Sequence, residues 1–165
     1  MASLREELNK LRAFDDPTIE AALNIERTAV IFRSQALRLL RPHGLSPAGY
    51  NVLRILRGHS PTPRTCNQIK ADMVTPVPDL TRLADRLATD GLVERVTCPT
   101  DRRAVNLKLT PAGSKLLARL DGPVAALHRE QLGHLSDREL GQLSRLLAKA
   151  RGGAGADTGA GPAGE

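Results

Sequence analysis

Apolar residues in long stretches of this chain recur every three or four positions, which predicts a fold built mainly of helices. The longest stretch covers residues 16–42, and Asp16 followed by Pro17 is typical of a helix start. Its apolar residues occupy more than one face. A helix of this kind needs cover on two sides, so we expect its own domain on one side and a second chain on the other.

Two short helices joined by a compact turn are predicted in the middle of the chain. Thr65 and Gln68 have the spacing of a capping box, which indicates a helix start. Beyond the segment 75–78, apolar residues at positions i, i+3, i+4 and i+7 indicate a second helix, and Gly91 suits the left-handed cap at its end. Two helices in this arrangement form a helix-turn-helix.

The apolar period then changes from 3.6 to 2, which predicts a β-hairpin. The stretches 92–97 and 104–110 form its strands, and the charged segment 98–103 forms its tip. Because the hairpin directly follows the helix-turn-helix, we interpret it as a wing.

Helices are expected again after the hairpin. Thr110-Pro111 starts one that Gly122-Pro123 should kink or interrupt. Ser136 and Glu139 form a capping box for the last helix. From residue 152 the chain is rich in Gly and Ala and has almost no large apolar side chains, so we expect a disordered tail.

Composition adds limits to this picture. The chain has 165 residues, of which 41% are hydrophobic and 2% aromatic, so one packed domain with an aliphatic core is expected. No stretch has the length of a transmembrane helix and the N-terminus lacks a signal pattern, which favours a cytoplasmic protein. Two cysteines without CxxC spacing argue against a structural zinc site and a disulfide framework.

Positive charge is concentrated in one part of the chain. The net charge is +6, and no Asp or Glu occurs from Arg27 to Ala71. This run favours an anionic surface or ligand nearby, although a solvated surface of long side chains is the other interpretation. The segment from Ser60 to Thr110 carries 8 Lys or Arg and 6 Asp or Glu, so the helix-turn-helix and wing alone are only weakly basic.

The stretch from Leu80 to Leu117 resembles the recognition helix, wing and following helix of MarR-family regulators. The similarity rests on Gly91-Leu92-Val93, then Asp101-Arg102-Arg103, then the Leu-Thr-x-x-Gly pattern of 109–113, in that order. It extends over about 19–150. The resemblance implies a homodimeric transcription regulator that binds double-stranded DNA at a pseudo-palindromic operator, a repressor released by a small-molecule effector, with half-sites about 10 bp apart.

The fold expected is mainly α with a small β-hairpin wing, in which a winged helix-turn-helix domain is flanked by dimerisation helices. The expected boundaries are 1–15 for a short N-terminal helix or arm, 16–42 for a dimerisation helix, 43–110 for the winged helix-turn-helix DNA-binding domain, 111–151 for C-terminal dimerisation helices and 152–165 for the disordered Gly/Ala-rich tail.

A recognition helix presents its N-terminal side chains to base edges in the major groove, here Pro78, Asp79 and Arg82, with Thr81 suited to a phosphate. Arg82 is suited to guanine. Arg86 is expected to contact a phosphate or an intramolecular partner such as Asp90. Asp79 either accepts a hydrogen bond from a cytosine amino group or only stabilises the helix start.

Other contacts with DNA are expected around this helix. For the wing, the resemblance implies that Asp101 orients Arg103 toward the minor groove, where a narrow groove attracts Arg, and that Arg102 adds a tip or phosphate contact. Asp101 and Arg103 can also simply tie the hairpin together. The free N–H groups of the helix that Ser46 and Pro47 begin are suited to a phosphate.

The resemblance also implies a pocket for a small aromatic anion between the dimer helices and the winged domain. Tyr50, His43, Arg38 and Arg41 are the candidates, with a packed ring and a loop residue as the other interpretations of Tyr50 and His43. Family members that sense urate use a Trp, which this chain lacks. Urate is therefore disfavoured.

Two alternatives stay open at this stage. Cys66, near a helix start, and Cys98, at the wing, would allow a redox-responsive regulator, with an unreactive, partly buried thiol as the other interpretation of Cys66. A winged helix used for protein contacts would explain the weak local charge.

An enzyme is not expected, because the chain has no Gly-rich phosphate loop, HExxH or nucleophile elbow. Its four histidines lack the spacing of metal ligands on one helix, so neither metal nor cofactor is expected.

Overall fold

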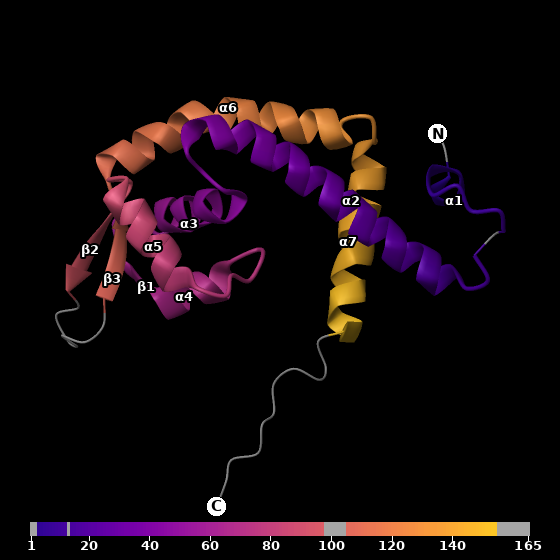
Figure 1. The fold of residues 1–165 in the computed structure, drawn as a ribbon, viewed down its shortest axis with the longest axis horizontal. Coiled ribbons are helices and arrows are strands. Elements are labelled where there is room, and N and C mark those ends of the chain that lie inside the picture. Colours follow the sequence, from indigo (N-terminus) through magenta and orange to yellow (C-terminus); the bar gives the residue numbers. More distant parts are fainter. Residues whose placement is uncertain (1–2, 13, 98–104, 155–165) are drawn as a thin grey trace, which may run out of the picture. The chain divides into compact units, whose positions relative to one another are not determined.

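The computed structural model describes residues 3–12, 14–97 and 105–154 (Figure 1). These residues form, in order, α1 (Leu4–Glu7), α2 (Pro17–Leu40), the 3₁₀ turn η1 (Arg41–His43), α3 (Pro47–Gly58), β1 (Arg64–Thr65), α4 (Cys66–Asp72), α5 (Leu80–Thr89), β2 (Val93–Thr97), β3 (Val105–Leu109), α6 (Pro111–Leu132) and α7 (Asp137–Ala154). The predicted fold class, mainly α with a small sheet, is confirmed.

The chain divides into two compact units, residues 1–125 and 126–165. The first contains α1 to α5, the sheet and most of α6, and the second contains the end of α6 and all of α7. In the described ranges no helix combines the length and the apolar character that crossing a membrane requires.

The helices begin where the sequence has capping chemistry. Asp16 Oδ1 accepts a hydrogen bond from Thr18 N at 2.7 Å, and Ser46 Oγ accepts one from Gly49 N at 3.0 Å. Each cap satisfies a backbone N–H that has no partner inside its helix. Gly91 ends α5 with φ +70°, a conformation that costs glycine nothing.

The core of the first unit lies between α3, α4, α5, the sheet and the first turns of α6. Its contributors come from elements far apart in the sequence, which is why these short elements hold together. The largest fully buried side chains are all aliphatic: Val52, Leu53, Leu56, Ile69, Leu107, Leu117 and Leu120. As composition predicts, no aromatic ring belongs to this set.

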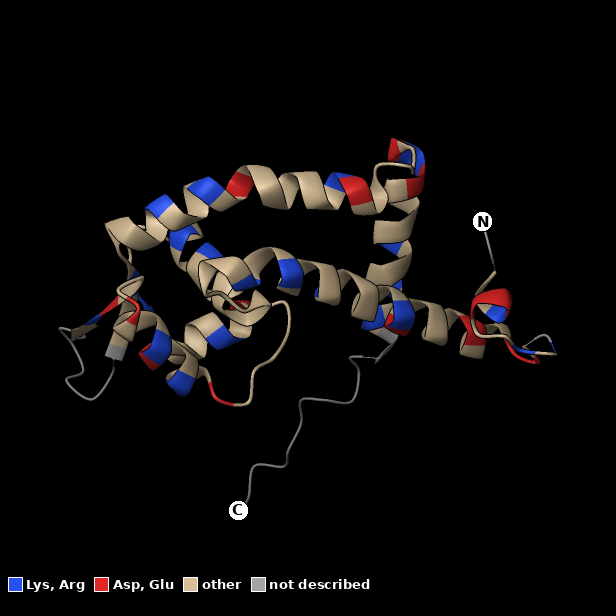
Figure 2. Cartoon of the chain, turned by 45° about the horizontal axis from the view of Figure 1, so that its top comes forward, with Lys and Arg blue, Asp and Glu red and all other residues tan. Residues whose placement is uncertain are grey.

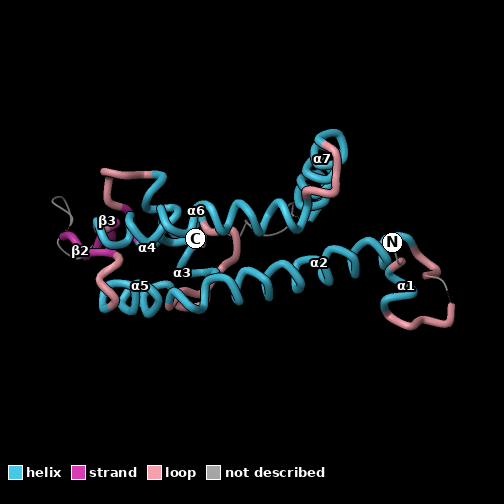
Figure 3. The backbone as a smooth tube through the Cα atoms, turned by 90° about the horizontal axis from the view of Figure 1, so that it is seen from above, coloured by secondary structure: helices cyan, strands magenta, loops and turns pink. Residues whose placement is uncertain are grey.

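The sheet has three antiparallel strands in the order β1-β3-β2, beside α4 and α5 (Figure 3). In the hairpin, Val93 pairs with Leu109 and Thr97 with Val105, as the alternating pattern predicts. The third strand was not predicted. The sequence does not reveal it, because β1 has only two residues, too few to show alternation, and its pairing of Arg64 with Leu107 is a tertiary contact.

Two expectations about the C-terminal half are corrected. Pro123 lies inside α6, which is continuous, so of the predicted kink or interruption the interruption is wrong. The preceding Gly122 has no Cβ to clash with the proline ring, and Pro123 is exposed, so water can bind the carbonyl that loses its N–H partner. The tail was expected from 152, but α7 continues to Ala154, since glycine costs a helix only about 1 kcal/mol. Residues 155–165 lie outside the described ranges.

Candidate nucleic-acid interface

The turn between α4 and α5 is fixed from outside by α3. The Oδ1 atom of Asn51 accepts a hydrogen bond from Val74 N at 2.9 Å, which satisfies a backbone donor in the exposed turn. The next residues include Pro76 and Pro78, whose rings fix φ and reduce the freedom of the segment. The start of α5 is therefore held relative to the core.

Helix α5 is amphipathic. Leu80, Ala84 and Leu87 are buried in the core. Turned away from the core, a row of polar side chains covers two helical turns, and we call this row the reading face: Thr81, Arg82, Asp85, Arg86 and Thr89, all exposed. Burial of one stripe thus fixes which side chains a partner can reach.

Asp79 is the N-cap of α5. Its Oδ1 accepts a hydrogen bond from Arg82 N at 2.8 Å, the geometry of a helix-stabilising cap. This is the helix-stabilising contact predicted for Asp79, and a hydrogen bond from a cytosine amino group stays a prediction. Pro78, just before it, is exposed at the end of the turn.

Arg86 lies where α5 meets the start of α3. No ion pair joins Arg86 to Asp90 in the described part of the chain, so the intramolecular partner considered for Arg86 is not found. Instead Arg86 and Asp90 both line a small surface hollow with Ser46 and Gly49. Arg86 and the N-terminal residues of α3 therefore lie around the same hollow.

The wing is anchored at its base to α5 and α6. Thr110 Oγ1 donates a hydrogen bond to Gly91 O at 2.7 Å and accepts one from Gly113 N at 3.0 Å. At Gly113 the backbone of α6 approaches Leu92 so closely that an added Cβ would lie 2.3 Å from Leu92 O. This contact explains why the sequence has Leu-Thr-x-x-Gly at this point.

Two ion pairs lie along the wing strands. Arg95 of β2 pairs with Asp85 of α5, and Glu94 Oε1 lies 3.5 Å from Lys108 Nζ, its cross-strand neighbour. The first pair ties the wing to the reading face. Asp85 and Arg95 were absent from the predicted site, because ten residues separate them and no local pattern signals their contact.

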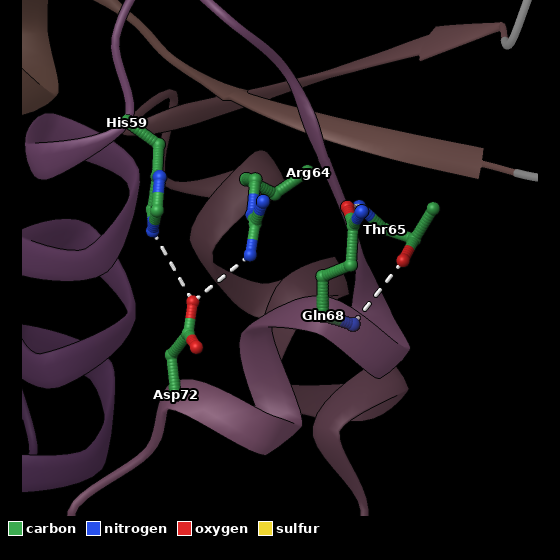
Figure 4. A network of polar contacts seen from close by, with 5 residues as sticks. All are labelled: His59, Arg64, Thr65, Gln68 and Asp72. Carbon is green, nitrogen blue, oxygen red and sulfur yellow. Dashed lines mark hydrogen bonds and ion pairs between the residues drawn. The ribbon is translucent and has the colours of Figure 1, made fainter.

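A network of polar contacts holds the two ends of α4 to neighbouring elements (Figure 4). Asp72 Oδ2 accepts a hydrogen bond from Arg64 Nη2 at 3.1 Å and lies 3.2 Å from His59 Nε2. Thr65 and Gln68 close the predicted capping box, with Gln68 N donating to Thr65 Oγ1 at 3.2 Å. The network joins the end of α4 to β1 and to the end of α3.

The charged residues around this surface differ between the segment 27–71 and α5. From Arg27 to Ala71 every charged residue is basic, which includes the exposed Arg33, Arg38 and Arg41 (Figure 2). On α5 the two signs alternate instead, because Asp85 lies between Arg82 and Arg86. The electrostatic attraction of an anionic partner must therefore draw on residues outside α5.

The residues proposed for an effector line neither of two hollows found on the described surface, one beside Ser46 and Arg86 and one beside Leu23 and Val30. Tyr50 is partly buried against the core, and Arg54 Nη1 donates to its hydroxyl at 3.4 Å. His43, Arg38 and Arg41 are exposed.

Of the two cysteines, Cys66 is free, half-buried and packed against the core at the first position of α4. Cys98 lies outside the described residues, as do Asp101, Arg102 and Arg103 of the wing tip. No group of three or more His, Cys, Asp or Glu with a geometry suited to a metal ion occurs in the described ranges.

Comparison with known proteins identifies the chain. The family model described as "MarR family" matches residues 43–104, the region from η1 to the wing. The crystal structure of a MarR transcription factor from Planctomyces limnophilus is 43% identical in sequence, covers 82% of this chain and 98% of that chain, and superposes with a TM-score of 0.64. The chain belongs to the MarR family. It is a winged helix-turn-helix, DNA-binding transcription regulator.

Two further matches agree with this assignment. A protein of Thauera aromatica, named as a transcriptional regulatory protein for the hcr operon, is 29% identical over 118 residues, which are 72% of this chain and 70% of that protein. The structure of a mutant MarR from Escherichia coli in complex with operator DNA is 27% identical, with a TM-score of 0.72, and covers 90% of this chain and 99% of that chain.

Proposed function

We propose that this MarR-family protein acts in the cytoplasm as a homodimeric repressor, which binds a pseudo-palindromic operator and leaves it when a small-molecule effector binds. The observation that carries the proposal is the reading face of α5, a polar row on a helix whose other side is locked into the core. A rigid helix with an exposed polar face fits the major groove of DNA.

On α5, Arg82 reads a guanine through two hydrogen bonds, and Thr81 and Arg86 contact phosphates. Arg82 is exposed in the first turn of the helix, the part that enters the groove. In the wing, Arg103, oriented by Asp101, enters the minor groove, and Arg102 contacts a phosphate.

The N-terminus of α3 provides a further phosphate contact. Its N-cap Ser46 lines the same hollow as Arg86, with Asp90 also in the lining. Pro47 has no N–H and the N–H of Gly49 is bound to Ser46 Oγ, so the attraction for an anion comes mainly from the positive end of the helix dipole and from Arg86. This contact adds sequence-independent affinity to a domain whose own net charge is small.

Homodimer formation is supported by apolar side chains that the single chain leaves exposed. On α2, Val30 is 59% exposed, and Ile25 and Leu37 are also accessible. On α7, Leu146 is 65% exposed. Several exposed aliphatic side chains on one helix are suited to a subunit interface, because a partner chain would remove them from water. The dimer then presents two α5 helices to major grooves about one helical turn apart.

An effector that prefers one spacing of the two α5 helices would change the affinity for DNA by a population shift. We propose a small aromatic anion, bound by Tyr50, His43, Arg38 and Arg41 once the dimer is assembled. For BpsR of Bordetella bronchiseptica, 19% identical and similar in fold with a TM-score of 0.74, 6-hydroxynicotinic acid is named as regulating DNA binding.

The test is binding of the purified protein to duplexes from the region upstream of its own gene, at several salt concentrations. The expected result is a dimer by sedimentation, one preferred duplex, and an affinity that falls steeply as salt rises. Arg103→Ala should weaken binding and flatten the salt dependence. A monomer without salt-dependent DNA binding would contradict the proposal and favour a module for protein contacts.

A further inference from the structure

A carboxylate lies in the middle of the reading face. Asp85 is three residues after Arg82 and four after Thr81, so all three project from one side of α5. Its side chain is 56% exposed. A free carboxylate at this position would repel DNA phosphates, so its partner decides what the face presents to DNA.

That partner is Arg95, which comes from the wing. In β2, Arg95 is on the same side of the strand as the buried Val93, two residues before it, and it is paired in register with the buried Leu107. At this position a strand usually buries an apolar side chain. Arg95 instead extends past the edge of the core, its side chain stays 40% exposed, and its Nη2 binds Asp85 Oδ1.

Stability alone does not account for this pair. Both side chains are exposed to a large degree, and ion pairs between exposed groups contribute little to folding. The pair does, however, fix a guanidinium at the junction of the two elements that the proposed function brings to DNA. A guanidinium has donors on three nitrogens, and Asp85 accepts from one of them.

We propose that Arg95 binds a DNA backbone phosphate, and that Asp85 acts as a positioning residue which holds the Arg95 guanidinium beside the reading face. The inference rests on the proposed function, because it needs α5 and the wing to face the duplex. In the complex, the guanidinium bridges one carboxylate and one phosphate. The charge of Asp85 is thereby neutralised at the point where it would oppose binding.

The test measures affinity for the preferred duplex against salt concentration. Arg95→Gln removes one phosphate contact, so the slope of log K against log salt should fall by about 0.9, and the affinity by about tenfold at low salt. Arg95→Lys keeps the charge and should keep the slope. Arg119→Gln, at an exposed position of α6 outside the proposed interface, is the matched control and should keep the wild-type slope.

The role of Asp85 needs a double-mutant cycle. Asp85→Asn in the wild-type background should lower affinity and leave the slope unchanged, because Arg95 loses its support but keeps its charge. In the Arg95→Gln background the same change should raise affinity, since it removes a carboxylate that nothing neutralises. Thermal unfolding of each variant checks that the domain is folded.

Three results would overturn the inference. Arg95→Gln could fold and keep the wild-type salt slope, which would make the pair a brace only. Asp85→Asn could steepen the slope, which would mean that Asp85 holds Arg95 away from DNA. Asp85→Asn could also change affinity equally in the wild-type and Arg95→Gln backgrounds, which would mean that the two residues act independently. If any of these results occurs while Arg82→Ala still weakens binding, only the inference fails and the proposed function stands. If the wild type binds no duplex, the inference and the proposed function both fail.

Discussion

Arg57 of α3 and Asp121 of α6 form a two-point ion pair across 64 residues of sequence. Nη1 lies 2.8 Å from Oδ2 and Nη2 lies 2.7 Å from Oδ1. Arg54 adds a longer contact of 3.8 Å to the same carboxylate. The hydrogen bonds from Arg57 favour the charged carboxylate and lower the pKa of Asp121 from its ordinary value. The pair therefore ties α6 to α3 only while Asp121 is ionised.

This pair predicts a specific pH dependence of stability. A lowered pKa in the folded state means that the contribution is complete above the ordinary Asp pKa of about 3.9 and is lost as the pH falls below it. Asp121→Asn should therefore unfold more easily than the wild type at pH 7, and the difference should close at pH values below about 3.9. Urea unfolding at a series of pH values measures both curves.

Asp15→Asn is the control, since no ion pair of Asp15 occurs in the described part of the chain. The gap in unfolding free energy between Asp15→Asn and the wild type should not narrow as the pH falls, unlike the gap for Asp121→Asn. A difference for Asp121→Asn that stays constant down to the most acidic condition would contradict the role assigned to the Arg57 pair.

The close approach of α6 to the wing predicts that Gly113 cannot be replaced. A Cβ there would lie 2.3 Å from Leu92 O and 2.7 Å from Leu109 Cδ1, and the first of these is a backbone atom that cannot rotate away. Gly113→Ala should cost about 2–4 kcal/mol in the free energy of unfolding. Gly58→Ala is the matched control, because nothing lies within 4 Å of that Cβ and alanine favours a helix. Equal stability of the two variants would show that the contact is not tight.

The cap of α5 predicts that stability and DNA affinity can be changed separately at Asp79. Asp79→Ser keeps an acceptor for Arg82 N, so stability should change by less than about 0.5 kcal/mol, whereas Asp79→Ala should cost about 1 kcal/mol. Because Asp79→Ser also removes a negative charge beside the duplex, it should raise affinity several-fold at low salt. A loss of affinity confined to operators with cytosine at one position would instead show that Asp79 reads a base.

Most of the local structure could be predicted, because its causes are local. The caps at Asp16, Ser46 and Thr65 and the left-handed Gly91 each depend on a few neighbouring residues. Side-chain chemistry at those positions satisfies backbone groups whatever the rest of the chain does.

What could not be predicted depends on contacts between distant residues. The two residues of β1 become a strand only because β3 offers them a pairing edge. Asp85 finds Arg95, and Arg57 finds Asp121, only after the core has fixed the elements that carry them. The period of α5 indicates which of its side chains are buried, because that pattern is local, but it does not show that Arg95 neutralises Asp85.

The most direct test of the central claim, that the exposed face of α5 reads DNA, is the discrimination of Arg82→Ala between the preferred duplex and a set of single-base variants of it. We predict that the wild type discriminates at one guanine by about 1–3 kcal/mol and that Arg82→Ala loses this preference there and nowhere else, while Arg119→Ala keeps it. If Arg82→Ala is folded and dimeric and still discriminates like the wild type at every position, the reading face lies elsewhere.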